Sequence, residues 1–245
     1  MKMDENGDID LSFLDANIVE NEQDLINKIY PSLNEHAFDI KWFGERAILA
    51  PKNADVAALN NKLLQQQTGE QKTYRSFDTI VEESDASNYP TEVLNSLGPP
   101  GMPPHQLNLK VGTPIMLLRS LDAPKLVNGT RLIVKQLFDN VILATIITGK
   151  FSGEDVFIPR IALMPSNFLI EFKRTQFPVK LCYAISINKS QGQSLKFAGI
   201  HLAAGSCFSH GQLYVACSRC GDNRNLTILA PGGKTRNIVY QQIFE

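Results

Sequence analysis

A short apolar run that opens into a polar, glycine-containing loop constrains the fold of this chain more than any other stretch. Residues 181–185 are almost entirely apolar, residues 186–191 are mostly polar, and Gly192 follows. This pattern predicts a buried parallel strand whose carboxyl end leads into a loop. In open α/β sheets, ligands bind outside the carboxyl ends of the strands. Backbone N–H groups near a glycine, beside a lysine and small hydroxyl groups, suit a phosphate of a nucleotide or of a nucleic-acid backbone.

A second stretch, residues 209–219, predicts an amphipathic helix that Ser209 can cap at its start. Its apolar residues recur at spacings of three and four and share one face: Leu213, Ala216 and Cys217. Gln212 and Arg219 lie two helical turns apart and are expected to project from one side. On its own, such an arginine is more often a solvated surface residue than a ligand-binding group.

The segments around these two stretches predict a doubly wound α/β domain. Helices are expected at residues 22–30, at 53–67 and in the tail to residue 245, and buried strands at 46–51, 197–203 and 226–230. Asn53 is a suitable N-cap for the second of these helices. Residues 1–21 are acidic and weakly patterned, which is typical of a loop or a disordered segment.

A β-rich block interrupts this alternation. After a strand at 76–82, prolines and glycines mark a linker that contains a short helix at 91–97. Short β-like runs separated by turn residues follow at 113–118, 130–138, 141–147 and 155–159. Closely spaced short strands predict a small barrel. Because the α/β alternation resumes afterwards, we interpret the block as an insertion.

Charge and cysteine content narrow the class of protein. The net charge is −1, but residues 1–24 carry eight acidic residues and one lysine, which leaves +6 for the remainder. Basic residues concentrate at 110–135 and 171–196. A mildly basic body is compatible with a polyanionic partner without requiring one. Four cysteines do not suggest a disulfide framework, and no apolar run is long enough for a membrane span, so we expect an intracellular protein without membrane contact.

Together, the two stretches resemble motifs V and VI of superfamily-one helicases, specifically the Pif family of 5′-to-3′ DNA helicases. Motif V of that family runs close to A-x-S-I-H-K-S-Q-G-x-T-L, and residues 184–195 read A-I-S-I-N-K-S-Q-G-Q-S-L. Motif VI runs close to F-x-x-G-Q-x-Y-V-A-L-S-R, and residues 208–219 read F-S-H-G-Q-L-Y-V-A-C-S-R. Residues 49–56 resemble motif IV, L-x-P-T-N-x-x-V, with Lys52 in place of threonine. Residues 109–134 resemble the family's 2B insertion.

The resemblance covers about residues 22–232 and implies a RecA-like (P-loop NTPase type) α/β second motor domain with an inserted SH3-like, 2B-type β-barrel. The expected divisions are 1–40, an acidic tail with a helical remnant of the first motor domain; 41–90 and 175–245, the two parts of domain 2A; and 91–174, the 2B barrel. It also implies the C-terminal half of an ATP-dependent helicase that translocates 5′-to-3′ on single-stranded DNA and unwinds duplex. The expected roles are DNA repair, recombination, replication or telomere maintenance, in the nucleus or the mitochondrion.

Residue roles are carried over from the matching motif positions. Arg219 is expected to act as an arginine finger with Gln212 in support, and both are the catalytic candidates. The nucleotide-binding candidates are Gly192, Gln191, Tyr214 and Arg219. The DNA-binding candidates are Lys52, Asn53, Asn188, Lys189 and Ser190. Asn188 replaces the family's histidine and loses a ring for stacking, and Asn53 is equally well explained as a plain helix cap.

ATP and Mg²⁺ are the implied cofactors, and single-stranded DNA and DNA junctions the implied partners of a monomer. The sequence contains no G-x-x-x-x-G-K-[ST] pattern and no recognisable Walker B motif, so we expect most cofactor ligands from a first motor half and no activity from this chain alone. The sequence P-G-G-K-T at 231–235 lacks the required glycine at position 228 and is expected to be a turn.

Two alternatives remain open. One is a non-catalytic, single-stranded DNA-binding relic of a mobile-element helicase. The other is a zinc-dependent interaction domain, suggested by the C-x₂-C pair Cys217 and Cys220 near His201, Cys207 and His210. The spacing does not supply a second pair of ligands, so we expect no metal site.

Overall fold

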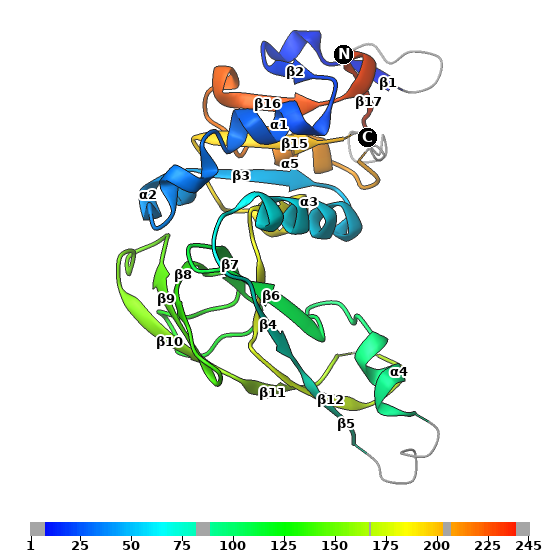
Figure 1. Cartoon of the computed structure of the whole chain (residues 1–245). Coiled ribbons are helices and arrows are strands. Elements are labelled where there is room, and N and C mark those ends of the chain that lie inside the picture. The colour runs from blue at the N-terminus through cyan, green and yellow to red at the C-terminus, as the bar shows by residue number, and fades with distance from the viewer. Residues whose placement is uncertain (1–7, 82–88, 167, 203–206, 239–245) are drawn as a thin grey trace. The chain divides into compact units, whose positions relative to one another are not determined.

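The computed structural model describes residues 8–81, 89–166, 168–202 and 207–238 (Figure 1). The chain divides into two compact units. Unit 1 comprises Met1–Gln66 and Tyr183–Glu245, and unit 2 comprises Gln67–Cys182. Among the described residues, no helix is long and apolar enough to cross a membrane.

Unit 1 is built on a parallel sheet of five strands in the order β14-β3-β15-β16-β2. These strands are β14 (Ala184–Ser186), β3 (Arg46–Ala50), β15 (Phe197–His201), β16 (Leu226–Leu229) and β2 (Asn17–Val19). Every residue of β3, β14 and β16 is buried, which explains why these strands read as continuous apolar runs. The strands predicted at 46–51, 197–203 and 226–230 are therefore confirmed.

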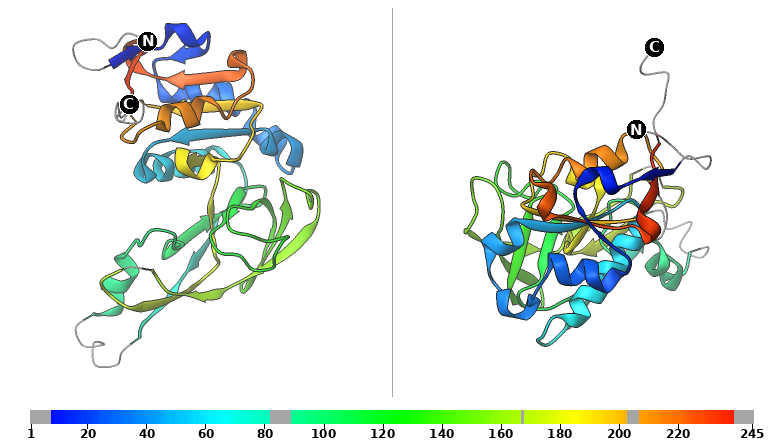
Figure 2. Two further views of the ribbon diagram at one scale, coloured as in Figure 1. Left: turned by 180° about the vertical axis from the view of Figure 1, so that it is seen from behind. Right: turned by 90° about the horizontal axis from the view of Figure 1, so that it is seen from above.

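Helices cover both faces of this sheet (Figure 2). On one face lie α1 (Glu22–Ile29) and α3 (Asn53–Gln66), and on the other lies α5 (Gln212–Cys217) with η4 (Ile187–Ser190). The remaining helical turns of unit 1 are η1 (Ser12–Leu14), η2 (Leu33–His36), α2 (Ile40–Gly44), η5 (Asn223–Asn225) and η6 (Pro231–Gly233). The predicted helix at 22–30 is confirmed: Asn21 caps α1 by accepting a 2.9 Å hydrogen bond from the Asp24 backbone N–H.

The acidic N-terminal segment is more ordered than its composition predicts. Instead of a loop, it contains β2 and also β1 (Asp8–Asp10), which pairs antiparallel with β17 (Lys234–Arg236). Ile9 and Leu11 are fully buried, because an extended chain directs alternate residues inward while the acidic ones stay outside. The tail contains β17 where a helix was predicted, and residues 239–245 lie outside the described part. The turn predicted at 231–235 is confirmed by η6, with Gly232 and Gly233 at positive φ.

Unit 2 is mostly antiparallel β-structure. Its strands are β4 (Lys72–Arg75), β5 (Phe77–Ile80), β6 (Gln106–Leu109), β7 (Pro114–Leu117), β8 (Arg131–Leu137), β9 (Val141–Ile146), β10 (Asp155–Pro159), β11 (Ile161–Leu163), β12 (Phe172–Gln176) and β13 (Val179–Leu181). They form a five-stranded sheet β10-β9-β8-β7-β13, a three-stranded sheet β11-β12-β5 and the pair β4-β6. The five-stranded sheet is open at β10 and β13, so the predicted closed barrel is not seen.

Unit 2 extends beyond the insertion expected at 91–174 on both sides. It starts at Gln67 because β4 pairs with β6 and β5 pairs with β12. It ends at Cys182 because β13 pairs with β7. The single strand predicted at 181–185 is thus two strands, β13 in unit 2 and β14 in unit 1.

A buried ion pair stabilises the region of unit 2 around α4 (Thr91–Ser96). Arg174 on β12 and Asp78 on β5 are both fully buried, and Arg174 Nη2 lies 2.6 Å from Asp78 Oδ2. The guanidinium also donates to the backbone carbonyls of Leu94, Leu97 and Pro103 at 2.9 to 3.1 Å. All five of its N–H groups are therefore used within unit 2.

Candidate functional site

The predicted DNA-binding residues follow two neighbouring strands at the same edge of the unit 1 sheet. Strands β3 and β14 are parallel, and their last residues, Ala50 and Ser186, are paired. Chain segments that follow the two strands therefore emerge side by side. One carries Lys52 and Asn53, and the other carries Asn188, Lys189 and Ser190 in η4.

Four of these five residues are accessible. The side chains of Lys52, Asn53, Asn188 and Lys189 are exposed. Ser190 is fully buried, and its hydroxyl donates a 2.7 Å hydrogen bond to the Ile187 carbonyl. In this structure Ser190 closes the helical turn and does not face a ligand, which corrects the role assigned to it.

Helix α3 begins one residue earlier than the capping prediction requires. The Val56 backbone N–H donates to the carbonyl of Lys52 at 3.2 Å, so Lys52 takes the N-cap position and Asn53 is the first helical residue. The predicted capping role of Asn53 is therefore wrong. Its exposed amide remains at the carboxyl edge of the sheet.

The loop after η4 is a tight turn that needs glycine. The Gln193 N–H donates to the Ser190 carbonyl at 2.9 Å, with Gln191 at φ −58° and ψ 129° and Gly192 at φ +81°. These values are those of a type II turn, whose third position requires a positive φ. A Cβ at Gly192 would meet no atom within 4 Å, so the backbone there is open to an approaching group. Gln191 is also exposed.

Arg219 connects the two motif segments. Its guanidinium donates to the Gln193 carbonyl at 3.3 Å, in the loop that contains Gly192. It also donates to the Val215 carbonyl at 2.9 Å and to the Ser218 hydroxyl at 2.8 Å. Three of its five N–H groups are thus used, and among the described residues no carboxylate neutralises its charge. The sequence interpretation missed the Gln193 carbonyl and Ser218, although both lie within the matched motifs.

The helix that carries these residues is shorter than predicted. Gly211, at φ +68°, occupies the N-cap position in place of Ser209, and no side chain caps the helix. The helix ends at Cys217, so Arg219 lies beyond it and does not share a helical face with Gln212.

Gln212 is held inside unit 1 at the start of α5. Its side chain is 3% exposed, and its Oε1 accepts a 3.0 Å hydrogen bond from the Phe208 N–H. Its Nε2 is buried without a hydrogen-bond partner among the described residues. Tyr214, two residues on, is 75% exposed. A buried donor without a partner is costly, and a functional role is one explanation for it.

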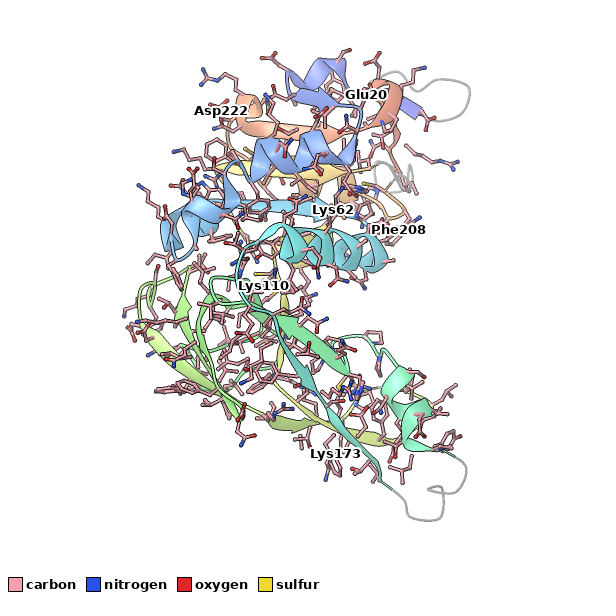
Figure 3. All side chains as sticks on the ribbon, in the orientation of Figure 1. Glu20, Lys62, Lys110, Lys173, Phe208 and Asp222 are labelled. Carbon is pink, nitrogen blue, oxygen red and sulfur yellow. The ribbon has the colours of Figure 1, made fainter. Side chains whose placement is uncertain are left out.

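A charged cluster that the motifs do not include also lies at this edge. His201, the last residue of β15, has Nε2 3.2 Å from Glu22 Oε2, and Glu22 Oε1 accepts a 2.7 Å bond from Lys62 Nζ. Lys62 is labelled in Figure 3. Burial raises the pKa of Glu22, but the contacts with Lys62 and His201 outweigh it and the pKa is lowered. The cluster joins α1, α3 and β15 and has a structural role.

Three features of unit 1 fit one side of a nucleotide. Arg219, the Gly192 turn and Gln212 all offer N–H donors, which suit the oxygen atoms of a phosphate chain. The described residues contain no group of three histidine, cysteine or acidic side chains that could hold a metal ion. Unit 1 thus offers donors that suit a phosphate chain.

The cysteines near α5 show no sign of thiolate chemistry. Burial raises the pKa of Cys217 to about 12, with the neighbouring Cys207 adding to the effect, and burial raises the pKa of Cys207 to about 11. Cys220 Sγ lies 3.2 Å from the carbonyls of Lys196 and Asp222. Neutral thiols are poor metal ligands.

Known proteins show similarity to both units. A family model for the 2B domain of DNA helicase Pif1 matches residues 92–137. The ATP-dependent DNA helicase PIF1 of Xenopus laevis is 33% identical over 176 residues, which cover 71% of this chain and 26% of that protein. The chain spans about a quarter of the length of such curated relatives.

Solved structures agree with this assignment. The Pif1 helicase of Candida albicans superposes with a TM-score of 0.63 at 22% identity, covering 91% of this chain and 57% of that one. A Pif1 structure described as the basis for DNA unwinding at forked duplex DNA gives a TM-score of 0.61 at 26% identity, covering 92% and 51%. The RecA-like α/β fold and the presence of a 2B domain are thereby confirmed. The chain belongs to the Pif1-like helicase family and corresponds to the C-terminal part of its members.

Proposed function

We propose that this chain forms the second motor domain and the 2B domain of an ATP-dependent helicase that moves 5′-to-3′ on single-stranded DNA. The observation that carries the proposal is the hydrogen bond from Arg219 to the Gln193 carbonyl, which joins motifs V and VI beside the open Gly192 turn. The family membership and the forked DNA named for a structural relative support a DNA substrate.

Exposed residues at the carboxyl edge would hold the DNA backbone. Lys189 and Lys52 supply positive charge, and Asn188 and Asn53 supply hydrogen-bonding amides. Contacts of this kind read no sequence, and they weaken as salt rises because binding releases counterions from the phosphates. Asn188 cannot stack on a base as the family histidine can, so we assign it a phosphate or sugar contact.

Arg219 and its neighbours would face the nucleotide. The uncompensated guanidinium would stabilise negative charge on the terminal phosphate, and the backbone at Gly192 would approach the same group. Gln212 Nε2, buried without a partner in the described residues, would donate once a ligand or a domain movement brings an acceptor. Bound ATP would supply the free energy for domain movement, with Mg²⁺ ligands coming from a first motor domain.

Single-stranded DNA binding tests the proposal. We would measure fluorescence anisotropy of a labelled oligothymidine over a salt series for the wild type, Lys189→Ala and Lys196→Ala. Lys196 is also an exposed lysine of unit 1, but it precedes β15 at the amino edge of the same sheet. We expect Lys189→Ala to weaken binding about threefold to tenfold and to reduce the salt dependence, and Lys196→Ala to bind like the wild type. Equal effects of the two substitutions would contradict the proposal.

ATPase activity distinguishes this function from a DNA-binding relic. We expect these residues alone to show no ATP turnover, because the sequence contains no Walker A pattern. Adding a first motor domain of a Pif1 helicase in trans should then restore turnover, and Arg219→Ala should abolish that restoration. A chain that binds DNA but never supports turnover would favour the non-catalytic relic.

A further inference from the structure

The arm of unit 2 formed by β4, β5 and β12 has one covered face and one open face. On the inner side, Asp78 and Arg174 form the buried ion pair, and Arg174 bonds to carbonyls of α4 and of the linker after it. Because side chains alternate along a strand, the residues next to Asp78 on β5 and next to Arg174 on β12 point to the outer face. On that outer face Arg75, Phe77 and Lys173 are exposed, and Thr79 and Thr175 are half-buried.

Phe77 lies at the centre of the outer face and is 70% exposed. Its cross-strand partner on β12 is Thr175, and Lys173 pairs with Thr79 one step further along. Lys173 is therefore the diagonal neighbour of Phe77, with about 7 Å between their Cα atoms. The Cα atom of Arg75, two residues before Phe77, lies at a similar distance. Lys173 is labelled on β12 in Figure 3.

The cations on this face have no ionic partner within the described part of unit 2. Arg75 and Lys173 are exposed, and no hydrogen bond or ion pair of either side chain is found among the described residues. Asp78, which follows Phe77 on β5, points inward and is bound to Arg174. Glu171, opposite Val81, lies at the far end of the face. Thr175 and Thr79 add hydroxyl groups opposite Phe77 and Lys173, and Gln106 is the cross-strand partner of Arg75.

We propose that this face, defined by Arg75, Phe77 and Lys173, is a second contact surface for single-stranded DNA. An exposed aromatic ring on a flat sheet can stack on an unpaired base, and flanking cations can contact the phosphates on either side. Duplex DNA has no unstacked base to offer, so the surface favours a single strand. The inference rests on the proposed function for the class of ligand, but it concerns residues outside every matched helicase motif.

The chain offers a matched control for the aromatic ring. Phe157 on β10 is 64% exposed and also projects from a sheet of unit 2. Its strand neighbour Asp155 already binds Lys135, so the charges beside Phe157 are paired. Both Phe77→Ala and Phe157→Ala remove an exposed phenyl ring from a strand of unit 2. The two sites differ in the unpaired positive charge that lies beside Phe77.

The test uses the full chain and an oligothymidine probe in the same anisotropy assay. We expect Phe77→Ala to weaken binding about fivefold or more, and Phe157→Ala to have no effect. Arg75→Ala and Lys173→Ala should each reduce the slope of log affinity against log salt by about 0.7. A probe containing 5-iododeoxyuridine should form a photochemical adduct on the peptide that contains Phe77. Unchanged melting temperatures would show that the variants fold.

The two proposals fail in different ways. In one outcome, Lys189→Ala weakens binding, Phe77→Ala binds within twofold of the wild type, and the photochemical adducts form on other peptides as in the wild type. The outer face is then not a DNA surface, and the motor-domain site stands. If the adduct on Phe77 persists while Lys189→Ala has no effect, the outer face stands and the motor-domain track is wrong. Equal affinity for a blunt duplex would overturn the stacking role of Phe77.

Discussion

The two units of this chain differ in where their positively charged side chains lie: among the described residues, most of the buried cations belong to unit 2, and those of the matched motifs in unit 1 are not buried. In unit 2, Lys110, Arg131 and Arg174 are at most 8% exposed, and Arg174 is fully committed to internal partners. In unit 1, Lys52 and Lys189 are exposed at the carboxyl edge, and Arg219 retains unused donors. The density of basic residues along a sequence therefore does not locate a binding surface. Burial separates the structural cations from those available to a ligand.

The energetic reason lies in the cost of burying charge. An ion loses several kcal/mol of hydration when it is buried, and only a close partner with additional hydrogen bonds offsets the loss. Arg174 meets both conditions through Asp78 and three backbone carbonyls. Arg46 is the corresponding case in unit 1: it is 6% exposed and donates to the carbonyls of Trp42 and Ile29.

The largest expected effect comes from breaking the buried ion pair of unit 2. Asp78→Ala leaves the Arg174 charge buried without its partner, and we expect the free energy of unfolding of unit 2 to fall by about 3–5 kcal/mol. Urea denaturation followed by far-UV circular dichroism measures the change. A loss below about 1 kcal/mol would show that the ion pair of Asp78 and Arg174 does not stabilise unit 2.

The single tryptophan separates the two units in this experiment. Trp42 is the only tryptophan of the chain and is buried in unit 1. Its fluorescence transition should stay in place in Asp78→Ala if the units unfold independently. Lys173→Ala, at the exposed position next to Arg174, serves as the control and should change stability by no more than about 0.5 kcal/mol.

A substitution in the core of unit 1 gives the complementary test. A Cβ at Gly199 on β15 would lie 2.8 Å from Ile29 Cγ1 and 3.0 Å from Leu25 Cδ1, both on α1. We expect Gly199→Ala to cost about 1–3 kcal/mol through overpacking. The Trp42 transition should move to lower urea while the signal of unit 2 stays. No shift would mean that α1 can move away from the sheet at little cost.

Local pattern was enough to predict much of the fold. The apolar runs of β3, β15 and β16, the helix α1 and the strands β7 to β10 were all expected near their observed bounds. The strand β12 was not, because it contains Lys173 and Arg174 and reads as a charged surface segment. Its buried arginine is explained only by Asp78, which lies far away in the sequence. Strand β2 was missed for a similar reason, since its partner β16 lies near the other end of the chain.

The motif match identified the site residues but not their environment. The proximity of Lys52 and Lys189 follows from strand order, which the βα alternation predicts in principle. The burial of Ser190 and Gln212 does not follow from strand order, because it depends on how α5 packs against η4. The sequence predicted that Arg219 shares a helical face with Gln212, but α5 ends at Cys217, two residues before Arg219. Side-chain burial at helix ends is a tertiary property, and a single sequence contains little signal for it.

A smaller effect should separate the turn at the site from an ordinary turn. Gly192 in unit 1 and Gly129 in unit 2 both have positive φ and open space around the position of a Cβ. Substituting either by alanine should cost about 1 kcal/mol through backbone strain alone. Only Gly192→Ala should also weaken single-stranded DNA or nucleotide binding, because that turn adjoins Arg219 through the Gln193 carbonyl. Equal binding by both variants would show that the Gly192 turn is merely structural.

The smallest expected effect concerns the buried thiols of Cys207 and Cys217, whose charged form is disfavoured in folded unit 1. Unlike Arg174, the thiols of Cys207 and Cys217 have no oppositely charged partner among the described residues, and burial raises their pKa to about 11 and about 12. The unfolded chain loses these protons near pH 9, before the folded chain does. Their contribution to stability is therefore fully present below pH 9 and is lost as the pH rises through 11 to 12.

We expect the urea midpoint of the Trp42 transition to fall between pH 8 and pH 10, and to fall less in the double variant Cys207→Ala, Cys217→Ala. Alkylation by iodoacetamide at pH 8 should be much slower at these two cysteines than in the unfolded chain, because the thiolate is the reactive species. Fast alkylation in the folded state would mean that the thiols are charged. The contrast between these thiols and Arg174 would then fail, since unit 1 would be stabilising buried thiolates.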